Sequence, residues 1–171
     1  MPSSYIGSED FRLSLNQWLK NRSARDAERI NSNKTMIPIQ LRNYSKLLYV
    51  GMVVDDDFVN RVNSGRGKVN DYMLWTKSVT IAKQSIRNQT LRQGQYKILI
   101  TKVVSQRDQV IDLDELITFM GIPQLAMFGF DKSELMKVQP HKSVLVTNSV
   151  TISRSDYNII EQYGSSADKS I

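Results

Sequence analysis

Two short apolar runs constrain the fold of this chain more than any other feature: LLYVGMVV at 47–54 and YKILITKVV at 96–104. Both are rich in β-branched and aromatic residues and too apolar for a solvent-facing edge, so they predict buried strands. The helices predicted between these two runs, at 55–62 and 78–88, are short. Such helices are too short and irregular for the regular crossovers of a doubly wound sheet, so the pattern predicts an α+β fold with a split sheet.

The N-terminal part of the chain has a helical pattern over residues 8–31. Ser8 is a suitable N-cap, and the acidic residues that follow it suit the positive end of the helix dipole. One apolar stripe at helical spacing consists of Phe11, Leu15, Trp18 and Leu19. A break near 21–23 divides the segment into two predicted helices, and Ser23 caps the second.

The rest of the chain contains further short elements without a linker, an internal repeat or a low-complexity segment. In chain order, we expect a strand at 72–76, a helix at 112–120, an irregular segment at 121–139, strands at 143–147 and 150–153, a helix at 155–163 and a frayed tail at 164–171. Because domains commonly contain ~100–200 residues, the whole chain, 1–171, is expected to form one domain.

The net charge of +6 is unevenly distributed, because residues 72–107 contain no acidic residue. The basic residues of this stretch are Lys77, Lys83, Arg87, Arg92, Lys97, Lys102 and Arg107. One interpretation is a basic face that binds the phosphates of a nucleic acid or dinucleotide, or an acidic protein. The alternative is a solvated helix and strand surface, since no aromatic residues interleave regularly with these charges.

The sequence also limits where the protein is expected to act. It contains no Cys, which excludes disulfides and Cys-based metal sites and favours a reducing compartment. The N-terminus has no charged region followed by an apolar run, so no signal peptide is expected. No apolar stretch approaches the ~18–20 residues that span a bilayer, so we expect a cytoplasmic protein without a membrane partner.

The sequence contains no intact reactive constellation. Its one histidine, His141, follows Pro140 and has no obvious orienting partner, so neither a Ser-His-Asp triad nor a His-rich metal site is predicted. Carboxylates at 55–57 and 112–115 could hold Mg²⁺, but both clusters lie at predicted helix starts, where carboxylates stabilise the helix dipole. We therefore expect no metal site, and no phosphate-cradling loop is present.

Three short motifs occur in an informative order. They are Leu48-Tyr49-Val50-Gly51 on the first strand, Trp75-Thr76-Lys77-Ser78 at the end of a later strand, and His141-Lys142-Ser143 directly ahead of an apolar strand. Their order and separations resemble the core of ADP-ribosyltransferases, in which the motifs are Leu-Tyr-Arg-Gly, aromatic-Ser/Thr-x-Ser and Glu-x-Glu. The resemblance covers 45–153. It implies an ADP-ribosyltransferase-like split β-sheet core with an N-terminal helical segment and short flanking helices.

The resemblance also implies which positions would contact NAD. The corresponding cofactor-binding positions are Tyr49, Gly51, Trp75 and Thr76. The family's arginine, which pairs with NAD phosphate or ribose, is replaced by Val50, although a guanidinium suits that task. The final glutamate, which stabilises an oxocarbenium-like transition state, is replaced by Ser143, and His141 replaces its partner carboxylate.

Few residues are candidates to compensate for these losses. Thr76 could still orient the nicotinamide ribose, and Glu134 lies in the segment before the third motif. Arg42, just before the first strand, and Arg66, in the glycine turn, could reach a phosphate. Because each compensation requires a separate rearrangement, Thr76 and Glu134 are only weak catalytic candidates.

The leading hypothesis is a catalytically inactive, ADP-ribosyltransferase-like binding or structural module with a protein partner and no cofactor. The resemblance extends to bacteriophage and bacterial domains that are toxins, host-modifying enzymes or parts of virions, which implies a host cytoplasm or a virion as the location. The alternative is an active transferase that uses NAD to modify a host macromolecule. A second alternative is a nucleic-acid-binding protein that uses residues 72–107.

Overall fold

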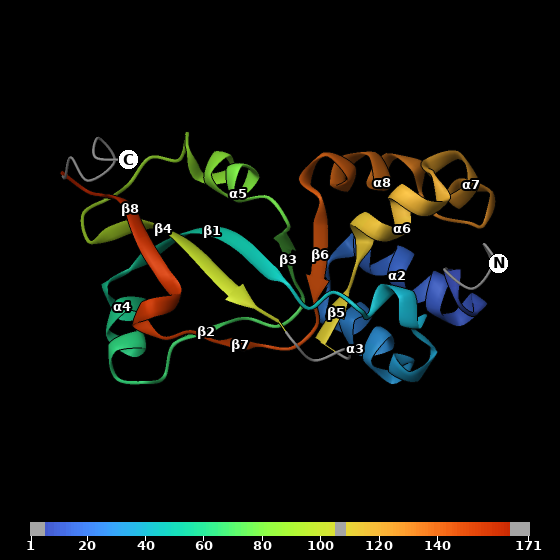
Figure 1. Cartoon of the computed structure of the whole chain (residues 1–171), viewed down its shortest axis with the longest axis horizontal. Coiled ribbons are helices and arrows are strands. Elements are labelled where there is room, and N and C mark those ends of the chain that lie inside the picture. The colour runs from blue at the N-terminus through green and yellow to red at the C-terminus, as the bar shows by residue number, and fades with distance from the viewer. Residues whose placement is uncertain (1–5, 105–108, 165–171) are drawn as a thin grey trace.

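A six-stranded antiparallel sheet runs through the described residues, 6–104 and 109–164, of the computed structural model (Figure 1). The strands are β1 Leu47–Asp55, β2 Lys68–Val69, β3 Met73–Thr76, β4 Gln95–Val103, β5 Val110–Ile111, β6 Ser143–Val146, β7 Val150–Thr151 and β8 Tyr157–Gln162. The sheet has the order β5-β6-β3-β1-β4-β8, and β2 pairs separately with β7. All pairings in this part of the chain are antiparallel.

Short helices flank the sheet. They are α2 Glu9–Asn21, α3 Ala24–Ser32, α4 Asp56–Asn63, α5 Val79–Ile86, α6 Leu113–Met120, α7 Ile122–Met127 and α8 Lys132–Val138, with 3-10 turns η1 Lys34–Met36, η2 Ile39–Leu41, η4 Gln139–His141 and η5 Arg154–Asp156. The predicted caps are confirmed: Ser8 Oγ accepts from the Phe11 N–H, and Ser23 Oγ accepts from the Asp26 N–H. Mixed helices with an antiparallel sheet confirm the α+β class.

Strand β1 takes part in two very unequal pairings. It pairs with β4 along its whole length, beginning with Leu47 opposite Val103. Its pairing with β3 consists of one residue pair, Tyr49 opposite Thr76. The sheet is therefore split at this seam, with β1-β4-β8 on one side and β3-β6-β5 on the other.

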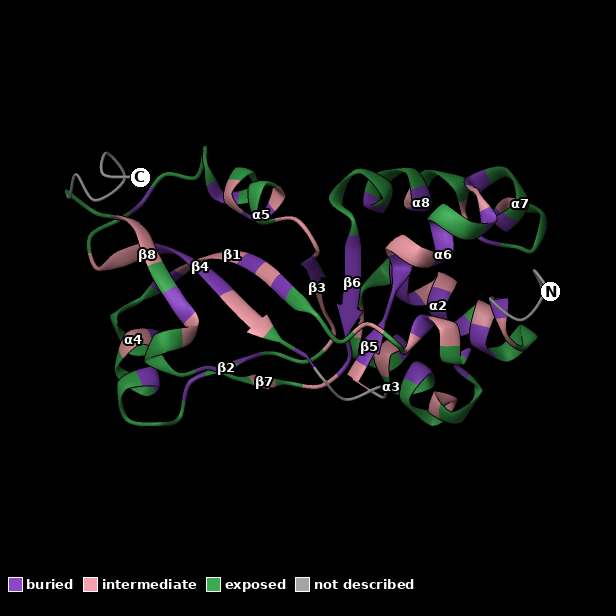
Figure 2. Ribbon diagram, in the orientation of Figure 1, coloured by how far each residue is buried: buried purple, intermediate pink, exposed green. Residues whose placement is uncertain are grey.

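The sheet borders two hydrophobic cores, and the first of them extends across the seam from β1 and β4 to Trp75 of β3. Leu48 and Ile98 belong to the core on the β1-β4 side, whereas the second core joins α2 and α3 to α6, α7 and α8. Strand β6 is buried along its length (Figure 2) and serves both cores. Successive side chains of a strand point to opposite faces, so Val144 and Val146 join the first core and Leu145 joins the second.

The predicted helix at 155–163 is wrong. Residues Tyr157–Gln162 form strand β8, which pairs with β4 and places Ile159 opposite Ile98. Tyr and Ile have high strand propensity, and β4 offers an open edge for pairing. The preceding 3-10 turn η5 has its own cap, a reciprocal capping box between Ser153 and Asp156.

The irregular segment predicted at 121–139 is also wrong, because it contains helices α7 and α8. Gly121, at φ 79°, ends α6 and precedes α7. Pro123 lies in the first turn of α7, where its missing N–H has no helical partner to lose. Asp131 caps α8 by accepting from the Ser133 and Glu134 N–H groups. The glycines and prolines of this segment therefore mark helix ends.

Two sequence expectations concern parts of the chain at or beyond the described ranges. The predicted tail at 164–171 lies outside them except for Gly164, which is exposed. Arg107 of the predicted basic face also lies outside them. Within the described ranges, no helix has both the length and the apolar character needed to cross a membrane.

Candidate functional site

A cavity of about 280 Å³ lies at the seam of the split sheet. Residues from both halves of the sheet and from α2, α5, α8 and η4 contribute to its walls. They are Arg22, Tyr49, Val50, Gly51, Leu74, Trp75, Thr76, Ile81, Ala82, Ser85, Lys137, Val138, His141 and Ser143. All four predicted cofactor-binding positions thus line one cavity, which we call the seam cavity.

The strand register explains why the three sequence motifs meet at the seam cavity. Thr76, the last residue of β3, lies opposite Tyr49 of β1 and opposite Ser143, the first residue of β6. Val50 follows Tyr49 on β1, and His141 ends the turn that leads into β6. Segments almost a hundred residues apart in the chain are therefore brought together by one antiparallel register.

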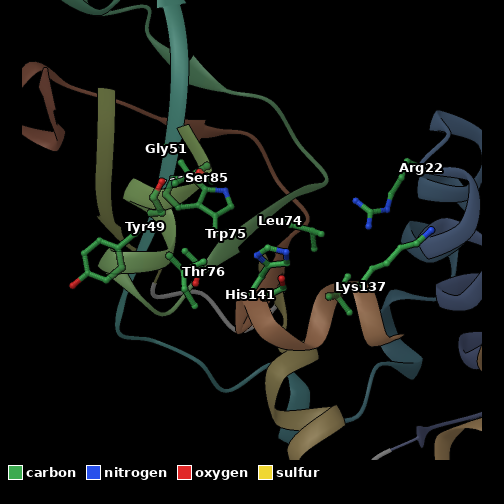
Figure 3. A pocket seen from close by; sticks show the side chains of 14 residues that line it. Arg22, Tyr49, Gly51, Leu74, Trp75, Thr76, Ser85, Lys137 and His141 are labelled. Atoms are coloured by element: carbon green, nitrogen blue, oxygen red, sulfur yellow. Dashed lines mark hydrogen bonds between the residues drawn. The ribbon is translucent and has the colours of Figure 1, made fainter. Parts of the chain in front are cut away.

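Figure 3 shows how the lining side chains are arranged. Gly51, Ser85 and Trp75 lie on one side, Arg22 lies on the opposite side, and His141 lies between them. The ring of Tyr49, by contrast, projects away from the other labelled residues (Figure 3). Tyr49 therefore contributes mainly its backbone position to the wall.

Gly51 is required by helix packing. A Cβ at this position would lie 2.4 Å from the Ala82 carbonyl oxygen and 3.1 Å from Ser85 Oγ. Real Cβ atoms do not approach a backbone oxygen so closely, so only glycine lets α5 lie directly on β1. The predicted cofactor contact at Gly51 is thus, in the structure, a contact between a strand and the helix that forms one cavity wall.

Trp75 supplies an unsatisfied donor to this region. Its side chain is 1% exposed, and its indole Nε1 has no hydrogen-bond partner among the described residues. Leaving a buried donor unpaired costs about 1–3 kcal/mol. An unpaired buried donor of this kind calls for an explanation, and Trp75 is one of the residues that line the seam cavity.

The hydroxyl groups of Thr76 and Ser143 are buried at the seam. The two residues are 7% and 3% exposed. Thr76 Oγ1 accepts a 3.1 Å hydrogen bond from the Ser78 N–H, which fixes the start of α5. His141 is exposed at the rim of the cavity. Thr76 therefore has a local structural role at the seam.

The main cationic group of the seam cavity is Arg22, which the sequence patterns did not identify. Arg22 ends α2 in a left-handed conformation, at φ 52°. Its Nε donates to the Leu19 carbonyl oxygen at 3.3 Å, and its guanidinium lies 4.8 Å from the Trp18 ring centroid. Burial lowers the pKa of Arg22, while the negative charge of Glu134 opposes that shift. The sequence feature that marks the position of Arg22 is the predicted break between two helices at 21–23.

Neither arginine proposed to compensate for Val50 lines the seam cavity. Arg66 Nε donates to Ser64 Oγ in the turn after α4. Arg42 ends the 3-10 turn η2, ahead of β1. Arg22, which follows helix α2 outside the predicted 45–153 core, is the arginine that lines this cavity among the described residues.

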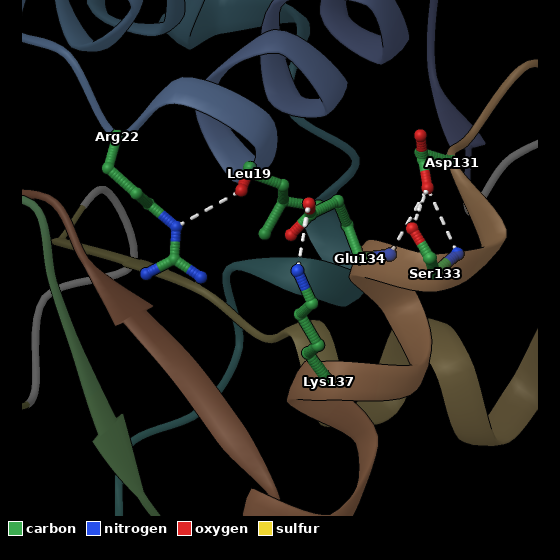
Figure 4. A network of polar contacts seen from close by, with 6 residues as sticks. All are labelled: Leu19, Arg22, Asp131, Ser133, Glu134 and Lys137. Carbon is green, nitrogen blue, oxygen red and sulfur yellow. Dashed lines mark hydrogen bonds and ion pairs between the residues drawn. The ribbon is translucent and has the colours of Figure 1, made fainter.

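Glu134 lies close to the seam cavity without lining it. Its Oε1 is 3.4 Å from Lys137 Nζ, one helical turn along α8 (Figure 4). Lys137 therefore turns its amine toward Glu134 while its side chain forms part of the cavity wall. Among the described residues that line the cavity there is no carboxylate, whereas Arg22 and Lys137 carry positive charge. This balance favours an anionic ligand.

Three of the six described basic residues of the predicted basic face are paired with acids from other parts of the chain. The ion pairs join Lys77 to Asp112 and Asp114, Lys97 to Glu161, and Lys102 to Asp156. Within the described ranges, Lys83, Arg87 and Arg92 have no ion pair and remain on and after α5. The acid-free stretch of sequence is therefore not an acid-free surface.

The two carboxylate clusters cap helices. Asp55 Oδ1 accepts from the Phe58 N–H at the start of α4, and Asp112 Oδ1 accepts from the Glu115 N–H at the start of α6. No group of three or more His, Asp or Glu side chains that could hold a metal ion is found in the described part of the chain.

Comparisons with protein-family models, curated proteins and solved structures find no significant match to this chain.

Proposed function

We propose that this chain is a catalytically inactive binding module with an ADP-ribosyltransferase-like core, whose seam cavity holds part of an NAD-like ligand. The observation that carries the proposal is the convergence of Val50, Thr76 and Ser143 on one cavity. These positions come from the three sequence motifs that resemble the family. A split antiparallel sheet with the cavity at the split also agrees with that resemblance.

The composition of the cavity supports binding. Most of its lining surface is apolar, and six lining residues besides Tyr49 and Trp75 have polar groups that remain to orient a ligand, as in many small-molecule sites. The Trp75 indole N–H offers a donor, and the Arg22 guanidinium offers a fork that matches phosphate. At about 280 Å³, the cavity lies just below the usual ~300–1,000 Å³. It would therefore enclose about one half of a dinucleotide.

The same composition supports the absence of catalysis. Cleavage of the nicotinamide–ribose bond develops positive charge on the sugar, which a carboxylate stabilises. Ser143 stands at the position of the family's glutamate, and a hydroxyl group cannot supply negative charge. Glu134 is directed to Lys137, so that no described carboxylate faces the bond that would break.

The test combines calorimetry with an assay of nicotinamide release. NAD should bind the full chain saturably, and Arg22→Ala should weaken binding about tenfold through the loss of charge-assisted hydrogen bonds. Arg66→Ala, which removes the same charge outside the cavity, is the matched control and should bind like the parent. Nicotinamide should not accumulate above the level in buffer. The absence of NAD binding would contradict the proposal.

An active transferase is the second candidate, because Arg22 lines the cavity and Glu134 lies beside it. In that case Glu134 would leave Lys137 and face the ribose when NAD binds. Nicotinamide release that disappears in both Thr76→Ala and Glu134→Gln would establish this candidate and overturn the inactive module.

A protein partner is part of the proposal. The helical end of the molecule exposes large apolar side chains on α6, α7 and α8, namely Phe119, Met127, Phe128 and Met136. Met127 is 85% exposed. Flexible methionine side chains adapt to varied partners, which supports recognition of a protein at this end.

A further inference from the structure

A second cavity, of about 920 Å³, lies between helix α3 and the segments that flank β3 and β6. One wall is a face of α3 with Ala27, Glu28 and Asn31, which follow Ala24 by three, four and seven residues. This spacing places all four on one side of the helix. The alanines leave space, and Glu28 and Asn31 supply polar groups. The volume falls within the ~300–1,000 Å³ of small-molecule sites.

The opposite wall of this second cavity is also polar. Asn70 and Asp71 precede β3, and Asn148 lies between β6 and β7. Within the described ranges, the side-chain amides of Asn31, Asn70 and Asn148 have no hydrogen-bond partner. Each amide provides both donors and an acceptor. Asparagines from three separate segments that line one cavity suit a ligand that is rich in hydroxyl groups.

Arg22 lines this second cavity as well as the seam cavity. Its Nε is bound to the Leu19 carbonyl oxygen, and its two terminal nitrogens have no partner in the described part of the chain. Planar guanidinium nitrogens bind two oxygens of a phosphate at once. The second cavity therefore has one cationic position, and this position suits a single phosphate group.

Two residues that line the second cavity share an uncommon backbone conformation. Arg22 and Tyr72 both have φ 52°, a left-handed backbone conformation that residues other than glycine rarely adopt. The Trp18 ring contacts both: the guanidinium lies 4.8 Å from its centroid, and the Tyr72 ring centroid lies 6.4 Å away. Strained backbone of this kind persists where the surroundings fix it and is concentrated at ligand sites.

The acidic residues of the second cavity restrict the ligand further. Glu28 and Asp71 line it, and neither has an ion pair within the described ranges. Carboxylates accept hydrogen bonds from sugar hydroxyls, but they repel chains of phosphates. We propose that the second cavity binds a sugar phosphate, with its hydroxyls on Glu28 and the amides and its phosphate on Arg22. A free sugar phosphate and a mononucleotide share this chemistry.

The two tryptophans of the chain allow each cavity to be observed separately, because Trp18 lines the second cavity and Trp75 lines the seam cavity. The experiment follows both indole N–H resonances of the ¹⁵N-labelled full chain during titration with ribose 5-phosphate. The Trp18 resonance should shift saturably, because the guanidinium over its ring changes partners. The Trp75 resonance should stay in place.

Asn31→Ala should weaken the Trp18 response about tenfold. This variant retains the fold because position 31 is exposed on a helix, where alanine is the best helix former. Asn63→Ala, at an exposed position of α4, should bind like the parent chain. In a parallel titration, tighter binding of AMP assigns the site to mononucleotides, and equal binding assigns it to the sugar phosphate alone.

Two results would overturn this second site. One is a Trp18 resonance that does not move at millimolar ribose 5-phosphate or AMP. The other is a shift of both indole resonances that Asn31→Ala leaves unchanged, because that result places the ligand in the seam cavity. Neither result depends on whether NAD binds, so the proposed function and the second site can fail separately.

Discussion

Even a methyl side chain at position 51, which is glycine, would clash with helix α5. The clash is with the Ala82 carbonyl oxygen, at 2.4 Å, so rotation of a side chain cannot relieve it. We expect Gly51→Ala to lower the free energy of unfolding by about 2 kcal/mol, as overpacking does elsewhere. Urea unfolding measures this change. Gln84→Ala, exposed on the same helix, should change stability by less than about 0.5 kcal/mol. An equally stable Gly51→Ala would contradict the packing of α5 on β1.

Lys77 provides the charge that keeps a buried carboxylate ionised. Its Nζ lies 3.0 Å from Asp112, whose side chain is 7% exposed, and 3.0 Å from Asp114. Burial raises the pKa of Asp112 above its ordinary 3.8, although Lys77 opposes the shift. We expect Lys77→Met to destabilise the fold by about 3 kcal/mol at pH 7, because it leaves Asp112 charged and unpaired.

The destabilisation by Lys77→Met should shrink as pH falls from 7 toward 4. Without Lys77 the folded-state pKa of Asp112 rises further. A carboxyl with a raised folded-state pKa favours folding below its unfolded-state pKa, and this contribution is lost as pH rises through the folded-state value. Unfolding of both proteins across this pH range measures the effect. The double variant Lys77→Met/Asp112→Asn should lose the pH dependence, and a deficit that is constant with pH would contradict the assignment.

Some of the individual residues that line the seam cavity could be predicted from the sequence. Short motifs of adjacent residues identified Thr76, His141 and Ser143, because each motif can be read from consecutive positions in the sequence. Arg22 could not be found in this way, because its position at the seam cavity follows from how α2 packs. The ion pairs that neutralise the strand lysines were also hidden, since their acidic partners lie elsewhere in the sequence.

Helix boundaries are determined by local chemistry, and the Ser23 cap of α3 tests this. Ser23 Oγ accepts from the Asp26 N–H at 3.1 Å and donates to Asp26 Oδ2 at 2.6 Å. We expect Ser23→Ala to lower the free energy of unfolding by about 1 kcal/mol, the usual cost of a lost N-cap. Chemical denaturation checks this value. Ser32→Ala, at the exposed end of the same helix, should leave stability unchanged, and an equal loss in both variants would contradict a capping role.

A helix or strand can be predicted from the sequence when the residues that determine it lie within the element itself. Caps and apolar stripes are local, so α2, α3 and α4 could be predicted within a few residues. The segment 157–162 depends on a partner: its strand form requires the edge of β4, which is distant in the sequence. The helices at 122–127 and 132–138 were predictable in principle, since Pro123 and Asp131 are ordinary helix-start residues.

In the whole molecule, the two halves of the sheet are connected by one residue pair, Tyr49 and Thr76, and by a hydrophobic core that they share, while a second core lies among the helices. The class of fold followed from the short helices, but the strand order did not. Strand order depends on pairings between residues far apart in the chain, such as Thr76 with Ser143, and no local pattern encodes these. The seam is also where Tyr49, Thr76 and Ser143, one residue from each of the three sequence motifs, lie opposite one another, and the proposed function rests on this register.

In the proposed function, the seam cavity binds an NAD-like ligand and leaves it intact. The most direct measurement follows the Trp75 indole N–H resonance during a titration with NAD and quantifies nicotinamide in the same sample. Trp75 Nε1 is buried without a partner in the described structure, so the account predicts a saturable shift while NAD remains intact. A Trp75 resonance that does not respond, or nicotinamide that accumulates, would contradict it.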